Sequence, residues 1–261
     1  STFLQRSYDQ LIHDIVVQNL DILLAIDRAG IVGADGETHQ GIYDISFLRI
    51  LPKIVLMTPS NELEMWKMLS TGFKHTGLAA VRYPRGYSQG EDIDLDHSTI
   101  EIGKGKIIQK GSKIAYLVFG TLLNVVEKVA KRNGATLIDM RFVKPIDEAL
   151  IIDICNTHDY IFTVEDNVIL GGAGTAVNEV MMKYSLKNNI VNIGVPDKII
   201  PHGSQDEILS ELGLDEIGIE RITNNLLLLK KFNSENTLSL SQPLTQDYPP
   251  KFTKPIKIIY S

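Results

Sequence analysis

Charged side chains follow two short apolar runs near the start of the sequence. Asp27 and Arg28 end one run, and Arg82 and Arg85 lie at and just past the end of another. Ligand sites of open α/β sheets lie at the carboxyl ends of strands, and arginine offers a rigid fork of donors for phosphate or carboxylate. Arginines on neighbouring strand ends would therefore form an anion-binding clamp. Ordinary surface salt bridges are the alternative interpretation.

Asp35 and His39 lie close together in a glycine-flanked loop. A histidine near a carboxylate can shuttle a proton or hydrogen-bond a substrate, and a purely structural pair is the alternative. No cluster of His, Cys, Asp and Glu in the sequence has the spacing of a metal site. We therefore predict no metal ligands in this chain.

A glycine-rich turn, residues 171–174, lies between a predicted strand and a predicted helix. Such a turn can receive a phosphate at the helix N-terminus, but it is neither G-x-G-x-x-G nor a P-loop. The acidic residues Glu165 and Asp166 precede it and disfavour an anion, so a tight turn with close packing is the favoured interpretation. Phe3 could stack on a flat ring, although an aromatic residue near a helix start usually belongs to the core.

The elements that must position these residues alternate between strand and helix. Strands are predicted at residues 22–26, 54–57, 79–83, 114–119, 136–138, 160–164 and 190–193, and helices at residues 4–20, 61–72, 122–131, 147–156 and 174–185, with two short helices near residues 206 and 215. Ser60 and Asp147 are the predicted N-caps. Repeated alternation predicts an α/β protein with a parallel sheet covered on both faces.

Composition sets limits on the class of protein. The 261 residues are 44% hydrophobic and 22% charged, enough to bury about two cores and unlike a disordered chain. A net charge of −6 gives no general basic surface for nucleic acid, and the apolar runs are too short for a membrane span. The single cysteine, Cys155, excludes an internal disulfide and fits a reducing compartment.

The composition changes along the chain predict the domain boundaries. We expect a first domain at residues 1–90, a linker at 91–101 in a stretch rich in Ser, Gly and Asp, and a second domain at 102–224. Residues 225–261 cluster Ser, Thr, Asn and Pro without periodicity. We predict that this tail is poorly ordered.

Several strings go beyond spacing and resemble the 1-deoxy-D-xylulose-5-phosphate synthase family. The matching strings are STFLQRSYDQ at residues 1–10, DRAG at 27–30, GADGETHQG at 33–41, VRYPRG at 81–86, DMRFVKP at 139–145 and GGAG at 171–174. Transketolases and 2-oxoacid dehydrogenase β-subunits share a looser form of the DG-x-TH loop, so DRAG together with STFLQR selects the synthase. The resemblance runs from residue 1 to about residue 223.

The resemblance implies a thiamine-diphosphate-dependent transferase that condenses pyruvate with glyceraldehyde 3-phosphate and releases carbon dioxide. The product, 1-deoxy-D-xylulose 5-phosphate, feeds isoprenoid and thiamine biosynthesis. The family is expected to act as a homodimer with Mg²⁺, in the bacterial cytoplasm or in a plastid if the source is eukaryotic. The implied fold is a partial pyrimidine-binding domain followed by a complete transketolase C-terminal-like α/β domain.

The resemblance also implies roles for individual residues. Phe3 matches the aromatic residue that stacks on the cofactor's aminopyrimidine, and Arg6 lies in the same cofactor-binding segment. Arg28 and Arg85 match the arginines that hold the substrate phosphate, the role that their strand-end position also favours. Asp35 and His39 match the polar pair near the reacting carbons.

Two motifs of the family do not occur in the sequence. They are the AEQH string with the catalytic glutamate and the GDG-type motif that places magnesium and diphosphate. We therefore expect a C-terminal fragment that is inactive alone, with the metal and diphosphate ligands in the missing part. The alternatives are a transketolase-family subunit that works with a separate partner chain and a non-catalytic remnant.

Overall fold

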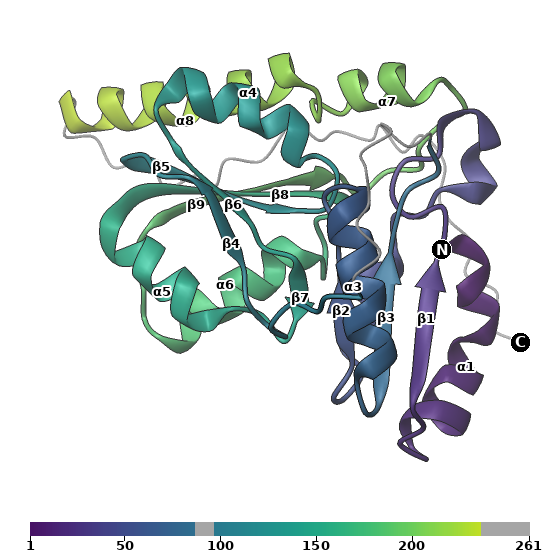
Figure 1. The fold of residues 1–261 in the computed structure, drawn as a ribbon. Coiled ribbons are helices and arrows are strands. Elements are labelled where there is room, and N and C mark those ends of the chain that lie inside the picture. Colours follow the sequence, from purple (N-terminus) through teal and green to yellow (C-terminus); the bar gives the residue numbers. More distant parts are fainter. Residues whose placement is uncertain (87–96, 236–261) are drawn as a thin grey trace, which may run out of the picture. The chain divides into compact units, whose positions relative to one another are not determined.

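The computed structural model describes residues 1–86 and 97–235. Its first sheet has four strands in the order β1-β3-β2-β7 (Figure 1). The strands are β1 (Ile22–Ile26), β2 (Val55–Met57), β3 (Leu78–Arg82) and β7 (Phe142–Lys144). The first three are parallel, and β7 joins β2 in the antiparallel direction. Helix α3 (Glu62–Lys74) packs its Met65 and Leu69 against one face of this sheet.

The second sheet has five strands in the order β4-β6-β5-β8-β9. They are β4 (Lys106–Gln109), β5 (Lys113–Phe119), β6 (Thr136–Asp139), β8 (His158–Val168) and β9 (Asn189–Val195). All pairs are parallel except β4 with β6. Figure 1 shows α5 (Glu148–Thr157) and α6 (Ala173–Lys183) on one face and α4 (Leu123–Asn133) on the other. This confirms the predicted α/β class.

One cluster of buried apolar side chains joins the two sheets. Leu56 of β2 and Leu117 of β5 belong to the same cluster of buried side chains, together with Val177 of α6. Each fully buried aliphatic side chain contributes roughly 1.5–3 kcal/mol to the hydrophobic stabilisation. The ends of strands from different sheets can therefore form one rigid site.

The N-terminal residues are helical but not one regular helix. A 3₁₀ segment, Thr2–Ser7, leads into α1 (Tyr8–Gln10) and a π-helical segment, Leu11–Val16. Leu4 and Leu11 still pack on the core, which explains why the apolar spacing predicted a helix here.

Of the two predicted helix N-caps, one was wrong and one was right. Asn61, rather than Ser60, caps α3, because its side chain accepts from the Glu64 amide at 2.9 Å. The Ser60 hydroxyl instead donates to Asp139 at 2.6 Å. Asp147 caps α5 as predicted. The short strands β4 and β7 and the short helix α2 (Asp44–Leu48) were not predicted.

The C-terminal part of the described chain is more helical than predicted. A short helix, α7 (Gln205–Glu211), precedes α8 (Glu216–Glu235), which has 20 residues and continues into the predicted tail. Residues 236–261 and part of the predicted linker lie outside the described residues. Among the helices described, none combines the length and apolar character needed to cross a membrane.

Candidate active site

Two arginines meet one carboxylate at the carboxyl ends of β1 and β3. The strands pair in parallel with Ile26 opposite Arg82, so the residues that follow them lie side by side. Arg28 Nε donates to Asp35 Oδ2 at 3.1 Å, and Arg85 Nη1 donates to Asp35 Oδ1. The side chains of Arg28 and Arg85 are 45% and 53% exposed, whereas Asp35 is 19% exposed. We call these three residues the arginine clamp.

The loop that carries Arg28 and Asp35 is fixed by its own backbone. We call residues 28–41 the clamp loop. Gly30 and Gly41 form an antiparallel bridge with N···O distances of 2.7 and 2.9 Å. Arg28 has a φ of 56°, a left-handed conformation that is uncommon for a residue other than glycine and collects at ligand sites. The loop therefore presents its side chains from a defined backbone.

His39 lies beside Phe3 rather than in the arginine clamp. The two rings form an edge-to-face pair with centroids 5.3 Å apart, and the Thr38 hydroxyl lies 2.9 Å from His39 Nδ1. The guanidinium carbon of Arg6 lies 5.7 Å from the Phe3 ring centroid. The structure thus groups Phe3, Arg6 and His39 on one side and pairs Asp35 with the two arginines.

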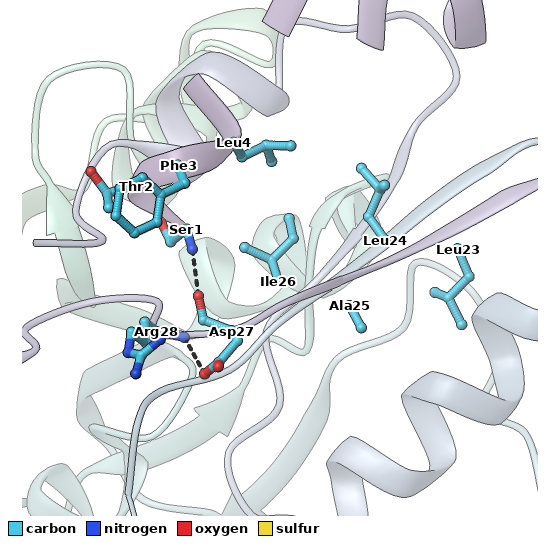
Figure 2. A pocket seen from close by; sticks show the side chains of 10 residues that line it. All are labelled: Ser1, Thr2, Phe3, Leu4, Leu23, Leu24, Ala25, Ile26, Asp27 and Arg28. Carbon is cyan, nitrogen blue, oxygen red and sulfur yellow. Dashed lines mark hydrogen bonds between the residues drawn. The ribbon is translucent and has the colours of Figure 1, made fainter. Parts of the chain in front are cut away.

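A pocket of about 360 Å³ lies between the N-terminal segment and β1. Figure 2 shows Phe3 near its Arg28 end and the side chains of Leu24 and Ile26 pointing toward the N-terminal segment. Phe3 is 54% exposed. An exposed aromatic ring beside an apolar wall can cover one face of a flat ligand.

Arg82 does not join the arginine clamp, contrary to one interpretation of the sequence. Its side chain is buried, with Nε 3.0 Å from Asp44 Oδ2 and Nη1 2.5 Å from Asp166 Oδ1. Burial lowers the pKa of Arg82, but the two carboxylates outweigh it and raise the pKa above its ordinary value. Arg82 is a buried structural cation that links the two sheets.

The glycine-rich turn at residues 171–174 binds a carboxylate of the chain itself. Glu165 accepts hydrogen bonds from the amides of Ala173 at 2.7 Å and Gly174 at 2.8 Å. A Cβ at Gly172 would collide with the same carboxylate. The tight-turn interpretation is therefore the right one, because Glu165 occupies the helix terminus that a phosphate would need.

Burial makes Glu165 a source of pH dependence. Desolvation outweighs the two amide donors and raises the pKa of Glu165 from its ordinary 4.5 to about 8. The folded state then holds a proton that the unfolded state has released, so the free energy of unfolding falls as pH rises from about 4.5 to 8. We expect Glu165→Gln to reduce the fall of the melting temperature with pH between pH 6 and 8.

Asp139 provides the control for this prediction. Burial raises its pKa from 3.8 to about 6, so Asp139→Asn should flatten the profile only below about pH 6. A melting temperature that stays constant from pH 6 to 8 in the unsubstituted chain would contradict the role of Glu165.

Matches to two family models cover most of the chain, and β7 of the first sheet lies within the second match. Residues 1–89 match the transketolase pyrimidine-binding domain, and residues 103–219 match the transketolase C-terminal domain. Curated relatives are 1-deoxy-D-xylulose-5-phosphate synthases: the protein of Vibrio campbellii is 53% identical over 227 residues and that of Pseudomonas fluorescens (strain Pf0-1) is 52% identical over 229 residues. The chain belongs to the 1-deoxy-D-xylulose-5-phosphate synthase family. These matches cover 87% and 88% of the chain but only 37% and 36% of the two synthases.

Solved structures confirm the transketolase-like fold of this synthase-family chain. A chain described as "Split gene transketolase, inactive beta4 tetramer" superposes with a TM-score of 0.78 at 23% identity, covering 88% of this chain and 75% of that one. The transketolase of Campylobacter jejuni superposes with a TM-score of 0.64 at 13% identity, over 86% of this chain and 34% of that one. At these identities the likeness shows the fold alone.

The sequence did not identify the residues behind the clamp loop. No motif or spacing in the sequence distinguished Asp44 and Asp166 from other acidic residues, and none pointed to Gln205. Gln205 Nε2 donates to the Ile31 carbonyl at 2.8 Å. In the part of the chain that the structure describes, no group of three or more His, Cys, Asp or Glu residues is arranged to hold a metal ion.

Proposed function

We propose that this chain forms part of a thiamine-diphosphate-dependent synthase that condenses pyruvate with glyceraldehyde 3-phosphate to 1-deoxy-D-xylulose 5-phosphate. Membership of the synthase family supports the reaction class. The observation that carries the proposal is the convergence of Arg28 and Arg85 on one carboxylate at neighbouring strand ends. Two half-exposed arginines that already hold an anion of the chain are suited to hold a phosphate.

In this proposal the substrate phosphate replaces Asp35 between the arginines. Phosphate carries more charge than a carboxylate and accepts bidentate hydrogen bonds from guanidinium groups. Asp35, once released, can accept a hydrogen bond from a substrate hydroxyl. Binding of the phosphate would thus free a carboxylate for the reacting end of the same molecule.

The Phe3 side of the pocket fits the pyrimidine end of the cofactor. Phe3 offers an exposed ring beside an apolar wall, and Arg6 lies over the same ring. When bound, thiamine diphosphate supplies the carbon nucleophile that carries the two-carbon unit left by pyruvate after decarboxylation. We propose that Mg²⁺ and the diphosphate bind the part of the enzyme that this chain does not span.

His39 is suited to move a proton at the acceptor carbonyl. Thr38 contacts its Nδ1, so exchange with substrate would use Nε2. An imidazole can both donate and accept a proton and is the side chain most often used for proton transfer in catalysis. We therefore assign His39 to proton transfer at the aldehyde oxygen as the new carbon–carbon bond forms.

The chain spans about 37% of the length of a related synthase, so the proposed activity needs a further part of the enzyme. We propose that it works with the remaining part of the enzyme, as a homodimer in a bacterial cytoplasm. A subunit that needs a separate partner chain is the alternative, and a solved transketolase chain of the same fold is described as inactive in its own tetramer. Both arrangements require the same clamp.

The test is Arg85→Ala in the complete enzyme. Losing hydrogen bonds to the phosphate should raise KM for glyceraldehyde 3-phosphate roughly 10- to 150-fold, equivalent to ~1.5–3 kcal/mol. KM for pyruvate should change little, because pyruvate carries no phosphate. Steady-state kinetics with each substrate varied in turn measure both values.

Arg132→Ala is the matched control, since Arg132 has a similar exposure of 43% but pairs with Glu216 and Glu220 on the second domain. It should leave both KM values unchanged. Equal losses for both substrates in Arg85→Ala would mean that Arg85 is structural and would refute the clamp.

A further inference from the structure

We propose that Asp166 and Gln205 of the C-terminal domain are positioning residues that set the clamp loop for acceptor binding. The inference deepens the proposed function and rests on it for the role of Arg28 and Asp35. Asp166 accepts a hydrogen bond from Arg82, and Gln205 donates one to the Ile31 carbonyl, so both bond groups behind the arginine clamp. Both residues act on the backbone of the clamp loop, which carries Arg28 and Asp35.

Asp166 supports the start of the clamp loop. It packs so closely on Gly30 that a Cβ there would collide with the Asp166 carboxylate. The same carboxylate holds Arg82 Nη1, while Arg82 Nη2 lies 3.3 Å from the Gly41 carbonyl oxygen. Since Gly30 and Gly41 bond to each other, Asp166 and Arg82 together hold both ends of the loop.

Gln205 supports the middle of the loop. Its Nε2 donates to the Ile31 carbonyl at 2.8 Å, and a Cβ on Gly33 would lie 2.7 Å from its backbone nitrogen. Gly33 begins the short 3₁₀ turn that ends at Asp35. The start of α7 therefore fixes the backbone position from which the Asp35 side chain reaches Arg28 and Arg85.

The placement of these supports gives the C-terminal domain a part in the reaction. The end of β8 and the start of α7 both press on the loop, and the amide of Val168 donates to the Ile42 carbonyl just beyond it at 2.9 Å. An error of about 1 Å in a binding group can cost on the order of 100-fold in rate. Loosening these contacts should therefore weaken acceptor binding without touching the pyruvate site.

The experiment uses hydrogen exchange at the Gly30 and Gly41 amides of the 261-residue chain. In Asp166→Ala we expect exchange there to quicken by at least ~10-fold and to stay faster than exchange of the β5 amides, which reports the global stability lost when Arg82 loses this partner. Asp166→Asn keeps the shape and one acceptor for Arg82, so its effect should be smaller. If Asp166→Ala does not fold, exchange at the Gly30 and Gly41 amides is measured on Asp166→Asn instead.

Glu165→Gln is the matched control, because the neighbouring carboxylate bonds the α6 amides instead of the loop. It should leave Gly30 and Gly41 exchange unchanged.

Gln205→Ala should raise KM for glyceraldehyde 3-phosphate in the complete enzyme several-fold and leave KM for pyruvate unchanged. Unchanged loop exchange in Asp166→Ala and Asp166→Asn, or loop exchange no faster than that of β5, overturns the inference.

The two proposals fail separately. If Arg85→Ala leaves KM for glyceraldehyde 3-phosphate unchanged, the phosphate clamp fails. The exchange measurement does not depend on any substrate, so it still decides whether Asp166 holds the loop.

Discussion

Replacing Arg82 by methionine should lower the free energy of unfolding by about 3–5 kcal/mol, the usual cost of leaving a buried charge without its partner. Arg82 is 3% exposed and lies between Asp44 and Asp166, which are 0% and 7% exposed. Methionine fills much of the same volume, so the loss comes mainly from the two stranded carboxylates. Urea denaturation of the substituted and unsubstituted chains measures the difference.

Neutralising the carboxylates gives the control for this prediction. Adding Asp44→Asn and Asp166→Asn to Arg82→Met removes the unpaired charges and should recover part of the lost stability. Arg132→Met removes an arginine with two exposed ion pairs and should leave the urea midpoint nearly unchanged. If Arg82→Met were as mild as Arg132→Met, the buried network would not stabilise the fold.

The strand-end rule predicted where the candidate site lies. Arg28 and Arg85 follow strands that pair in parallel, and parallel strands bring their carboxyl ends to one edge. Local sequence was enough because each arginine lies within three residues of the end of its own strand. The Asp147 cap of α5 was predictable for the same reason, since a cap acts within one turn.

The sequence could not distinguish Arg82 from Arg85. They are close in sequence, yet one is buried and the other is half-exposed. The difference depends on Asp166, which is 84 residues from Arg82 along the chain and comes from the other sheet. Local patterns contain no information about a partner at that separation.

The short antiparallel strands were missed for a related reason. β7 has 3 residues, too few for an alternating pattern to stand out from a loop. It is a strand because Phe142 is buried and the segment pairs with β2 of the first sheet. Tertiary contacts, rather than local preference, define this element.

The chain by itself should show no synthase activity and should bind thiamine diphosphate with Mg²⁺ only weakly. It spans about 37% of the length of a related synthase. In the proposed arrangement Phe3 covers one face of the cofactor's ring, and the described residues contain no group of three or more His, Cys, Asp or Glu side chains arranged for a metal. One stacked ring contributes about 1 kcal/mol beyond its buried area, far less than the several kcal/mol lost when a mobile ligand is immobilised.

Calorimetric titration of the purified chain with thiamine diphosphate and Mg²⁺ measures the first part of this prediction, and pyruvate-dependent product formation measures the second. Micromolar binding by the chain alone would mean that the residues described here hold the whole cofactor. Supplying the remaining part of a related synthase in trans should restore turnover, and Arg85→Ala in that mixture should again raise KM for glyceraldehyde 3-phosphate alone. Turnover restored equally well with Arg85→Ala would place the acceptor phosphate elsewhere, because the added part would then hold it without the arginine clamp.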